Sequence, residues 1–179
     1  MPLSSRRLID FLEEVDKQLE SSITLVAAGG TAMTLYELKP STIDVDFTGP
    51  GADLDLFRAA VKRIQPGFRV DTWPDGQVFS QFLPPDYLKK SEPIKTRLRQ
   101  IELRALDPLD IVVTKLGRLD GRDFDDIKAC VEARRLTKRR IIGRAKGVQY
   151  AGNQQVYDQN LEAVTRELFG RAKIKKPRA

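Results

Sequence analysis

Two short stretches near the amino terminus place the tightest limits on what this chain can fold into. Residues 26–31 are an apolar run that ends in two glycines and a threonine, and residues 43–47 alternate apolar side chains with Asp44 and Asp46. In a β-strand, side chains two positions apart lie on the same face, so a strand here would bring both carboxylates together and turn Ile43 toward the core. Neighbouring carboxylates repel each other, and a bound cation relieves that repulsion. The second stretch therefore predicts a cation site.

The two glycines are expected to form a sharp turn between a buried strand, residues 23–28, and a short helix, residues 31–38. Gly29 and Gly30 would let the backbone approach a phosphate closely, and the amides at the start of a helix point toward an anion. The hydroxyl of Thr31 can add one more donor. An ordinary strand-to-helix turn with small residues is the alternative, but the aspartates downstream favour a phosphate-binding turn beside a magnesium site.

The order of these motifs resembles the signature of the nucleotidyltransferase superfamily, which has the DNA polymerase β-like fold. Within that superfamily the chain looks most like the minimal nucleotidyltransferases, including those of toxin–antitoxin and abortive-infection systems. The matching part runs from about residue 25 to about residue 127. The resemblance implies metal-dependent transfer of a nucleoside monophosphate from a nucleoside triphosphate to an acceptor hydroxyl, with ATP among the expected substrates. The implied cofactor is Mg²⁺ or Mn²⁺, held by Asp44 and Asp46.

The resembled family has a third carboxylate on the strand that follows, where it serves as general base or further metal ligand. Asp71, in the predicted strand 68–73, is our choice for this catalytic and metal-binding role. Glu102 lies in a similar apolar setting and is the rival candidate, although it comes one strand later than expected.

Further nucleotide contacts are expected on two later helices. Lys115 follows the apolar residues 111–113, so we expect it to be partly buried, where a lysine needs an acidic partner or a ligand phosphate. The resemblance implies phosphate contact for Lys115 and a supporting polar role for Asp123 or Asp126, and we assign Asp126 to the nucleotide. Acidic residues also favour the start of a helix for purely structural reasons, which is the alternative for both aspartates.

Apolar periodicity elsewhere predicts an α/β fold, an α+β mixed sheet with covering helices. The expected strands are residues 23–28, 42–48, 68–73, 78–83 and about 94–106, and the expected helices are residues 5–20, 31–38, about 53–66, 107–119, about 121–135, 137–144 and 150–169. We interpret residues 1–106 as a nucleotidyltransferase-like core, 107–170 as a helical extension packed on it, and 171–179 as a basic tail that we expect to be disordered.

Composition excludes several kinds of chemistry. The chain has no histidine, which rules out a histidine zinc site, a Ser-His triad and a histidine base, so any metal should be a hard cation held by oxygen. The one cysteine, Cys130, cannot form an internal disulfide and fits a reducing cytoplasm. No apolar run approaches the roughly 20 residues of a membrane span, so we expect no membrane partner.

The net charge of +6 favours polyanionic partners, and the basic residues cluster late in the chain, at 134–146 and 171–178. Besides the nucleoside triphosphate, the resemblance implies an acceptor hydroxyl on RNA, on a protein or on a small molecule, and the basic clusters favour RNA. Two other classes remain open from the sequence. One is a non-catalytic nucleotide- or nucleic-acid-binding protein of the same fold, and the other is an antitoxin-like partner protein of a toxin–antitoxin pair.

Overall fold

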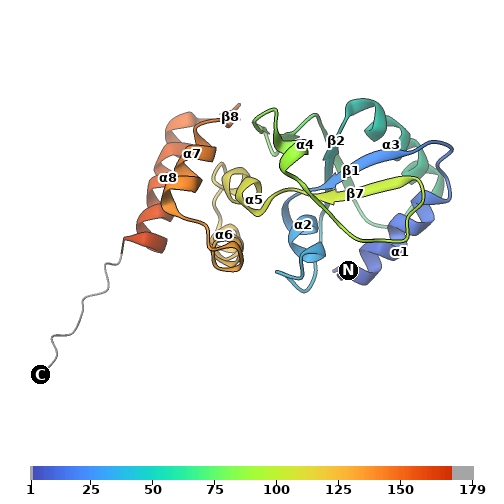
Figure 1. Ribbon diagram of the computed structural model, residues 1–179, viewed down its shortest axis with the longest axis horizontal. Coiled ribbons are helices and arrows are strands. Elements are labelled where there is room, and N and C mark those ends of the chain that lie inside the picture. Colours follow the sequence, from blue (N-terminus) through green and yellow to red (C-terminus); the bar gives the residue numbers. More distant parts are fainter. Residues whose placement is uncertain (1, 171–179) are drawn as a thin grey trace, which may run out of the picture.

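A five-stranded mixed sheet forms the core of the amino-terminal part of the chain (Figure 1). In the computed structural model, which describes residues 2–170, the strand order is β3-β2-β1-β7-β6. The central strand β1 is antiparallel to β2 and parallel to β7, while β3 is parallel to β2 and β6 is antiparallel to β7. The strands are β1 (Ile23–Ala27), β2 (Val45–Gly49), β3 (Val70–Pro74), β6 (Glu92–Pro93) and β7 (Ile101–Ala105). The predicted mixed α/β fold class is thereby confirmed.

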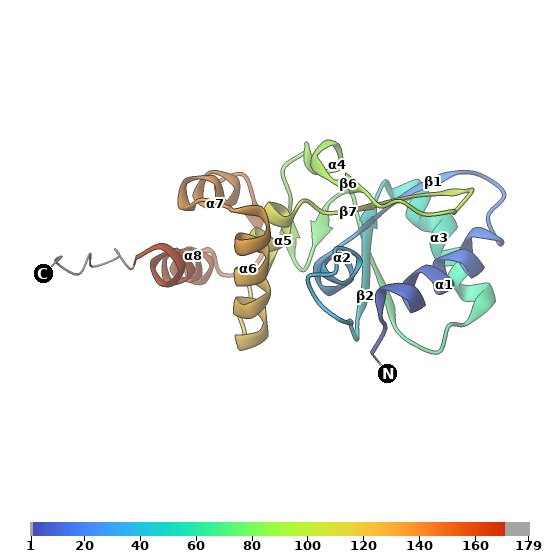
Figure 2. The ribbon, with the colours of Figure 1, turned by 60° about the horizontal axis from the view of Figure 1, so that its bottom comes forward.

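Helices cover both faces of this sheet. The helices α1 (Ser5–Asp16) and α3 (Gly51–Ile64) pack together on one face, and Figure 2 shows α2 (Gly29–Leu35) on the other side of β2. The apolar stripe of α1 is buried, as the helical spacing predicted. Between the layers, Phe47 and Phe57 meet edge to face with ring centroids 5.3 Å apart, which ties β2 to α3.

The end of α1 also fixes where β7 begins. The carboxylate of Asp16 accepts hydrogen bonds from the backbone N–H groups of Arg99, Gln100 and Ile101, at 2.8 to 3.1 Å. Asp53, in the first turn of α3, plays a similar part, because it accepts from the N–H of Thr24 at 2.8 Å. The helix α3 begins two residues earlier, at Gly51.

The carboxyl-terminal part is helical and is joined to the core by a second, small sheet. That sheet has the order β4-β5-β8, so a strand near residue 150 pairs with one near residue 81. Arg144 of α7 is buried and pairs with Asp110 of α5, which fixes these two helices against each other. The elements are β4 (Gln77–Val78), β5 (Gln81–Phe82), α4 (Tyr87–Lys90), α5 (Pro108–Lys115), α6 (Gly121–Arg134), α7 (Lys138–Ala145), β8 (Gln149–Tyr150) and α8 (Gln154–Phe169).

Several predicted boundaries are wrong. Strand β2 begins at Val45, and Ile43, predicted to face the core, is 62% exposed in the loop before it. The expected strand 78–83 is a tight hairpin of β4 and β5, and Tyr150, placed in the last helix, belongs to β8. Among the described helices, none is both long and apolar enough to cross a membrane. The predicted tail, 171–179, lies outside the described residues.

Candidate active-site cleft

A cleft of ≈ 510 Å³ opens where the glycine turn, the start of β2, the small sheet and the α5–α6 junction meet. This volume falls within the range of about 300–1,000 Å³ that is usual for ligand sites. Of the residues assigned from the sequence, the cleft is lined by Gly29, Gly30, Asp44, Asp46, Lys115 and Asp126. Stretches that are far apart in the sequence therefore contribute to one site.

Asp46 is the most unusual carboxylate in this cleft. Its side chain lies in β2 and is only 5% exposed. Within residues 2–170, the hydrogen bond to its carboxylate comes from the neutral indole of Trp73, with Nε1 3.3 Å from Oδ1, and no cationic side chain pairs with it. Burial raises the pKa of Asp46 to about 6, the bond from Trp73 opposes this rise, and the charges of Asp71 and Asp44 add to it. The surroundings of Asp46 thus destabilise its charged form.

Asp44 reaches the same cleft from a different local structure. It is exposed, it precedes β2, and none of the described basic side chains forms an ion pair with it. Its backbone carbonyl is fixed by two hydroxyls, since it accepts from Thr42 at 2.8 Å and from Thr31 at 3.2 Å. The two carboxylates therefore meet at one cleft even though only Asp46 lies in the strand.

The glycine turn packs so closely against the site that side chains are excluded from it. Gly29 has a φ of +49°, and a Cβ there would lie 3.0 Å from the ring of Phe79 and 3.7 Å from Oδ2 of Asp46. A Cβ at Gly30 would lie 2.7 Å from the hydroxyl of Thr42. The backbone of α2 can therefore start directly beside the carboxylates.

The hydroxyl of Thr31 has a different role from the one predicted. The residue is fully buried, and its hydroxyl accepts from the N–H of Asp46 at 2.9 Å while donating to the carbonyl of Asp44. Because both interactions are internal, the hydroxyl is not free to bind a phosphate. It holds the glycine turn against the acidic stretch.

The two candidates for a third acid lie at different distances from Asp46. Asp71 is paired in register with Asp46 across the parallel strands β2 and β3, which places both side chains on one face of the sheet. Its carboxylate accepts from Nε of Arg69 at 2.9 Å. Glu102 lies on β7, beyond β1, and pairs with Arg104 at 2.9 Å. Asp71 is thus the neighbour of Asp46, and Glu102 is separated from it by an intervening strand.

Lys115 of α5 also lines the cleft, where it belongs to a network of charges. Its Nζ is 2.9 Å from Asp123 and 2.8 Å from Asp126, which are further paired with Arg118 and Lys39, respectively. Burial opposes the charged form, yet the two aspartates raise the pKa of Lys115 above its usual value. Burial likewise opposes ionisation of Asp123, but bonds from Arg118 and Lys115 lower its pKa to about 2. The buried lysine therefore has the acidic partners that such a residue requires.

Residues of the small sheet complete the cleft, and sequence reasoning missed them. Phe79 and Ser80 form the turn between β4 and β5 with φ values of 50° and 64°, a strained conformation for residues other than glycine. This turn places the ring of Phe79 against Gly29 and at 5.5 Å from Trp73. Gln81 and Tyr150 follow on the same wall. Their pairing joins residues about seventy positions apart, and no local sequence pattern signals it.

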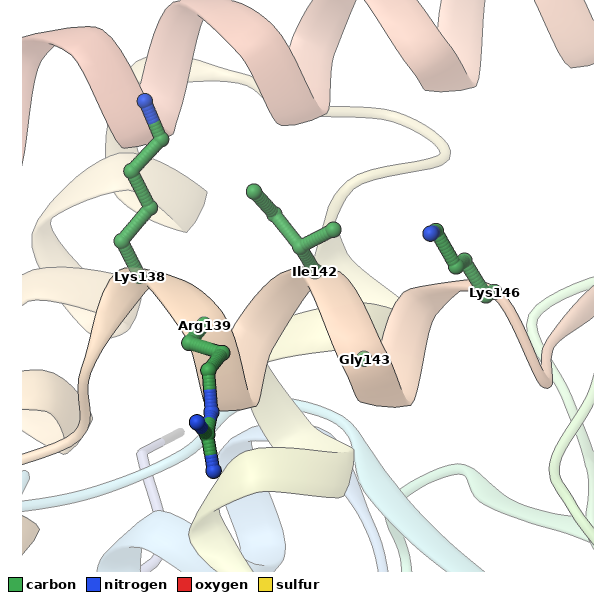
Figure 3. A pocket seen from close by; sticks show the side chains of 5 residues that line it. All are labelled: Lys138, Arg139, Ile142, Gly143 and Lys146. Atoms are coloured by element: carbon green, nitrogen blue, oxygen red, sulfur yellow. The ribbon is translucent and has the colours of Figure 1, made fainter.

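A second hollow, of ≈ 500 Å³, is shallow and runs along the exposed side of α7. Figure 3 shows Lys138, Ile142 and Lys146 on one side of the helix, with Arg139 pointing to the other. A Cβ at Gly143 would have no neighbour within 4 Å, so the surface of α7 around Gly143 is open. From residue 133 to residue 157 the chain has no acidic residue.

The mixed sheet and its covering helices are consistent with a nucleotidyltransferase-like fold. A family model described as a nucleotidyltransferase of unknown function (DUF6036) matches residues 6–163, and the chain belongs to that family. The comparisons with curated proteins and with solved structures gave no match. The superfamily expected from the sequence is thus confirmed.

Proposed function

We propose that this protein transfers a nucleoside monophosphate from a nucleoside triphosphate to an acceptor hydroxyl, in a reaction that depends on a divalent metal ion. The observation that carries the proposal is the environment of Asp46. A buried carboxylate beside Asp44 and Asp71, with no cationic side chain against it within residues 2–170, is destabilised in its charged form. A cation that enters with a triphosphate would remove this destabilisation.

The donor atoms fit Mg²⁺ or Mn²⁺. Within residues 2–170, no group of three or more His, Cys, Asp or Glu side chains is arranged to hold a metal ion. Mg²⁺ is usually bound by one or two carboxylates together with substrate phosphates, and Asp44 and Asp46 supply two on one cleft. When bound, such an ion neutralises charge on the attacking and leaving oxygens of an in-line displacement.

The chain's own groups would position the substrate. The backbone amides of Gly29, Gly30 and Thr31 begin α2 beside the carboxylates, where they can receive the β- and γ-phosphates. Lys115 would contribute positive charge from α5, held in place by Asp126. The glycine turn and α5 would then contact the same triphosphate.

Asp71 is the group proposed to accept the proton of the acceptor hydroxyl or to complete a second metal site. Its register with Asp46 supports this role over that of Glu102. Its partner Arg69 is 76% exposed, so the guanidinium can move into solvent at little cost and release the carboxylate.

The acceptor that we propose is RNA. Five basic residues around α7 are exposed and form no ion pair with another described residue: Arg135, Lys138, Arg139, Arg140 and Lys146. Clustered basic side chains without acidic neighbours suit a phosphate backbone, and binding to it weakens steeply with salt. Transfer of label to a protein would instead identify a protein acceptor. Recovery of the chain with a protein partner would favour a role in a toxin–antitoxin pair.

The test is incubation with each labelled triphosphate and total cellular RNA or protein, with and without EDTA. We expect label transfer that EDTA abolishes. Asp44→Asn and Asp46→Asn should each reduce transfer by at least about a hundredfold, because each removes a charge that the transition state requires. Asp125→Asn is the matched control, since Asp125 is an exposed aspartate of α6 outside the cleft. Full activity in either cleft variant, with the fold intact by circular dichroism, would refute the assignment.

A nucleotide-binding protein without turnover is the second candidate. The ion pair between Arg69 and Asp71 favours it, because the third acid is occupied by the chain itself. Calorimetry with Mg²⁺ and each nucleotide separates the candidates when run beside the transfer assay. Binding without transfer to any acceptor would support this second function.

A further inference from the structure

The small sheet places an amide and an aromatic ring side by side on the wall of the cleft. Gln81 of β5 and Tyr150 of β8 are directly opposite each other in an antiparallel pair, so their side chains share one face. Both line the cleft. A Cβ on Gly117 would lie 2.9 Å from Nε2 of Gln81 and 3.0 Å from Cε2 of Tyr150, so glycine lets both side chains approach the end of α5.

One end of the Gln81 amide is fixed and the other has no partner. Its Nε2 donates to the backbone carbonyl of Thr114, and a side chain at position 117 would press against the same nitrogen. The reverse orientation would set two carbonyl oxygens against each other, so Oε1 is the free end. Gln81 is 1% exposed, and among residues 2–170 its Oε1 is the one buried side-chain nitrogen or oxygen without a hydrogen-bond partner.

Such an atom requires a donor that the chain does not provide. An unmet buried acceptor costs free energy, and a ligand N–H that reaches it recovers that cost. The ring beside it is fixed as well, because the hydroxyl of Tyr150 donates to the carbonyl of Gly117 at 3.2 Å and the ring packs 5.6 Å from that of Tyr157. A flat heterocycle with an amino group offers both a surface for the ring and a donor for the amide.

We propose that Gln81 and Tyr150 form the nucleobase subsite of this cleft and that Oε1 of Gln81 accepts a hydrogen bond from an exocyclic amine. The proposal rests on the proposed function, since it names the base of the same nucleoside triphosphate. The amine meant here is the one at C6 of adenine or C4 of cytosine, where guanine and uracil carry a carbonyl oxygen; the amine of guanine is at C2, at the far end of the same edge of the base. The subsite therefore selects ATP and CTP over GTP and UTP.

The experiment measures dissociation constants by calorimetry, with Mg²⁺, for the four nucleoside triphosphates and for inorganic tripolyphosphate, which has no base. We expect the unmodified protein to bind ATP and CTP about tenfold more tightly than GTP and UTP. Gln81→Met keeps the length of the side chain but removes the acceptor, and should abolish this preference. It should leave the affinity for tripolyphosphate unchanged.

The matched control is Asn160→Leu. Asn160 also donates a side-chain amide to a backbone carbonyl at the end of α5, that of Leu116 at 2.6 Å, but it does not line the cleft. This variant removes a similar amide–carbonyl hydrogen bond without touching the cleft. It therefore shows whether loss of such a bond alone affects binding, and the base preference should persist in it. Should Gln81→Met fail to fold, Gly117→Ala displaces the amide from the other side and should weaken ATP and CTP binding selectively.

The outcomes separate this inference from the proposed function. Mg²⁺-dependent binding of all four triphosphates with equal affinity, or a preference that survives Gln81→Met, overturns the subsite while nucleotide binding stands. A preference that disappears in Gln81→Met supports the subsite even where no transfer is measured, in which case catalysis alone fails. Absence of any nucleotide and tripolyphosphate binding overturns both.

Discussion

Asp46 and Asp110 are both buried aspartates, and their surroundings differ in one respect. Asp110 is fully buried and Asp46 is 5% exposed, and burial raises the pKa of each. Asp110 receives the guanidinium of Arg144, with Nη2 2.8 Å from Oδ2, whereas Asp46 receives the neutral indole of Trp73. The charge of Asp110 is thus compensated within the chain, as befits a residue that joins α5 to α7. The charge of Asp46 has no ion-pair partner among residues 2–170, which is why we propose that a cation binds there.

The largest change in stability should come from removing Arg144, the cationic partner of Asp110. Arg144→Leu leaves a buried carboxylate without its partner and should lower the free energy of unfolding by about 3–5 kcal/mol. Urea denaturation followed by circular dichroism measures this change. The double variant Arg144→Leu with Asp110→Leu should recover most of the loss, because a buried pair replaced by apolar residues costs little. A loss below about 1 kcal/mol in the single variant would show that the pair does not hold these helices together.

Removing the charge of Asp46 should instead increase the stability of the protein. Its pKa is about 6 in the folded protein against 3.8 for an ordinary aspartate, so between these values the folded state binds more protons than the unfolded state. Stability therefore falls as the pH rises from about 4 to about 6 and stays reduced above that. Asp46→Asn should raise the free energy of unfolding at pH 7 by about 2–3 kcal/mol.

The pH dependence of this gain identifies its cause. Denaturation of both proteins at pH 7 and at pH 4 should show the gain at the higher pH and almost none at the lower, where Asp46 is protonated. Asp125→Asn, an exposed aspartate, should change stability at neither pH. A gain that is equal at both would point to packing instead of charge.

The smallest of the three effects is the one that a metal ion should produce. At a Mg²⁺ concentration about ten times the dissociation constant, the unmodified protein should gain about 1.4 kcal/mol in unfolding free energy. Asp46→Asn should lose this response, since one of two carboxylates has gone. Thermal denaturation with NaCl at matched ionic strength controls for screening. Equal stabilisation of both proteins by Mg²⁺ would show that the ion does not bind at Asp46.

The parts of the fold that local patterns encode could be predicted. The alternation around Val45 and Phe47 marked β2, and the aspartate and proline at residues 107 and 108 marked the start of α5. Boundaries failed where tertiary contacts override local preference. Ile43 continues the apolar alternation, yet hydroxyls from Thr31 and Thr42 hold the neighbouring carbonyl of Asp44 in a loop, and Ile43 is left exposed.

The parts of the cleft that could be predicted are those formed by residues close together in the sequence. The pairing of the two acidic positions with the glycine turn needed only spacing, and the burial of Lys115 followed from the apolar run before it. The partners of Lys115 depend on how α5 and α6 pack, and a glutamine such as Gln81 has no periodic signal of its own. Its place in the cleft is decided by a strand that arrives about seventy residues later.

A single hydroxyl, that of Thr31, forms hydrogen bonds with the backbone of both Asp44 and Asp46. The spacing between the glycine turn and the acidic stretch is thereby held by one oxygen atom in the first turn of α2. Position 31 therefore admits serine and excludes valine, which has the shape of threonine without its oxygen.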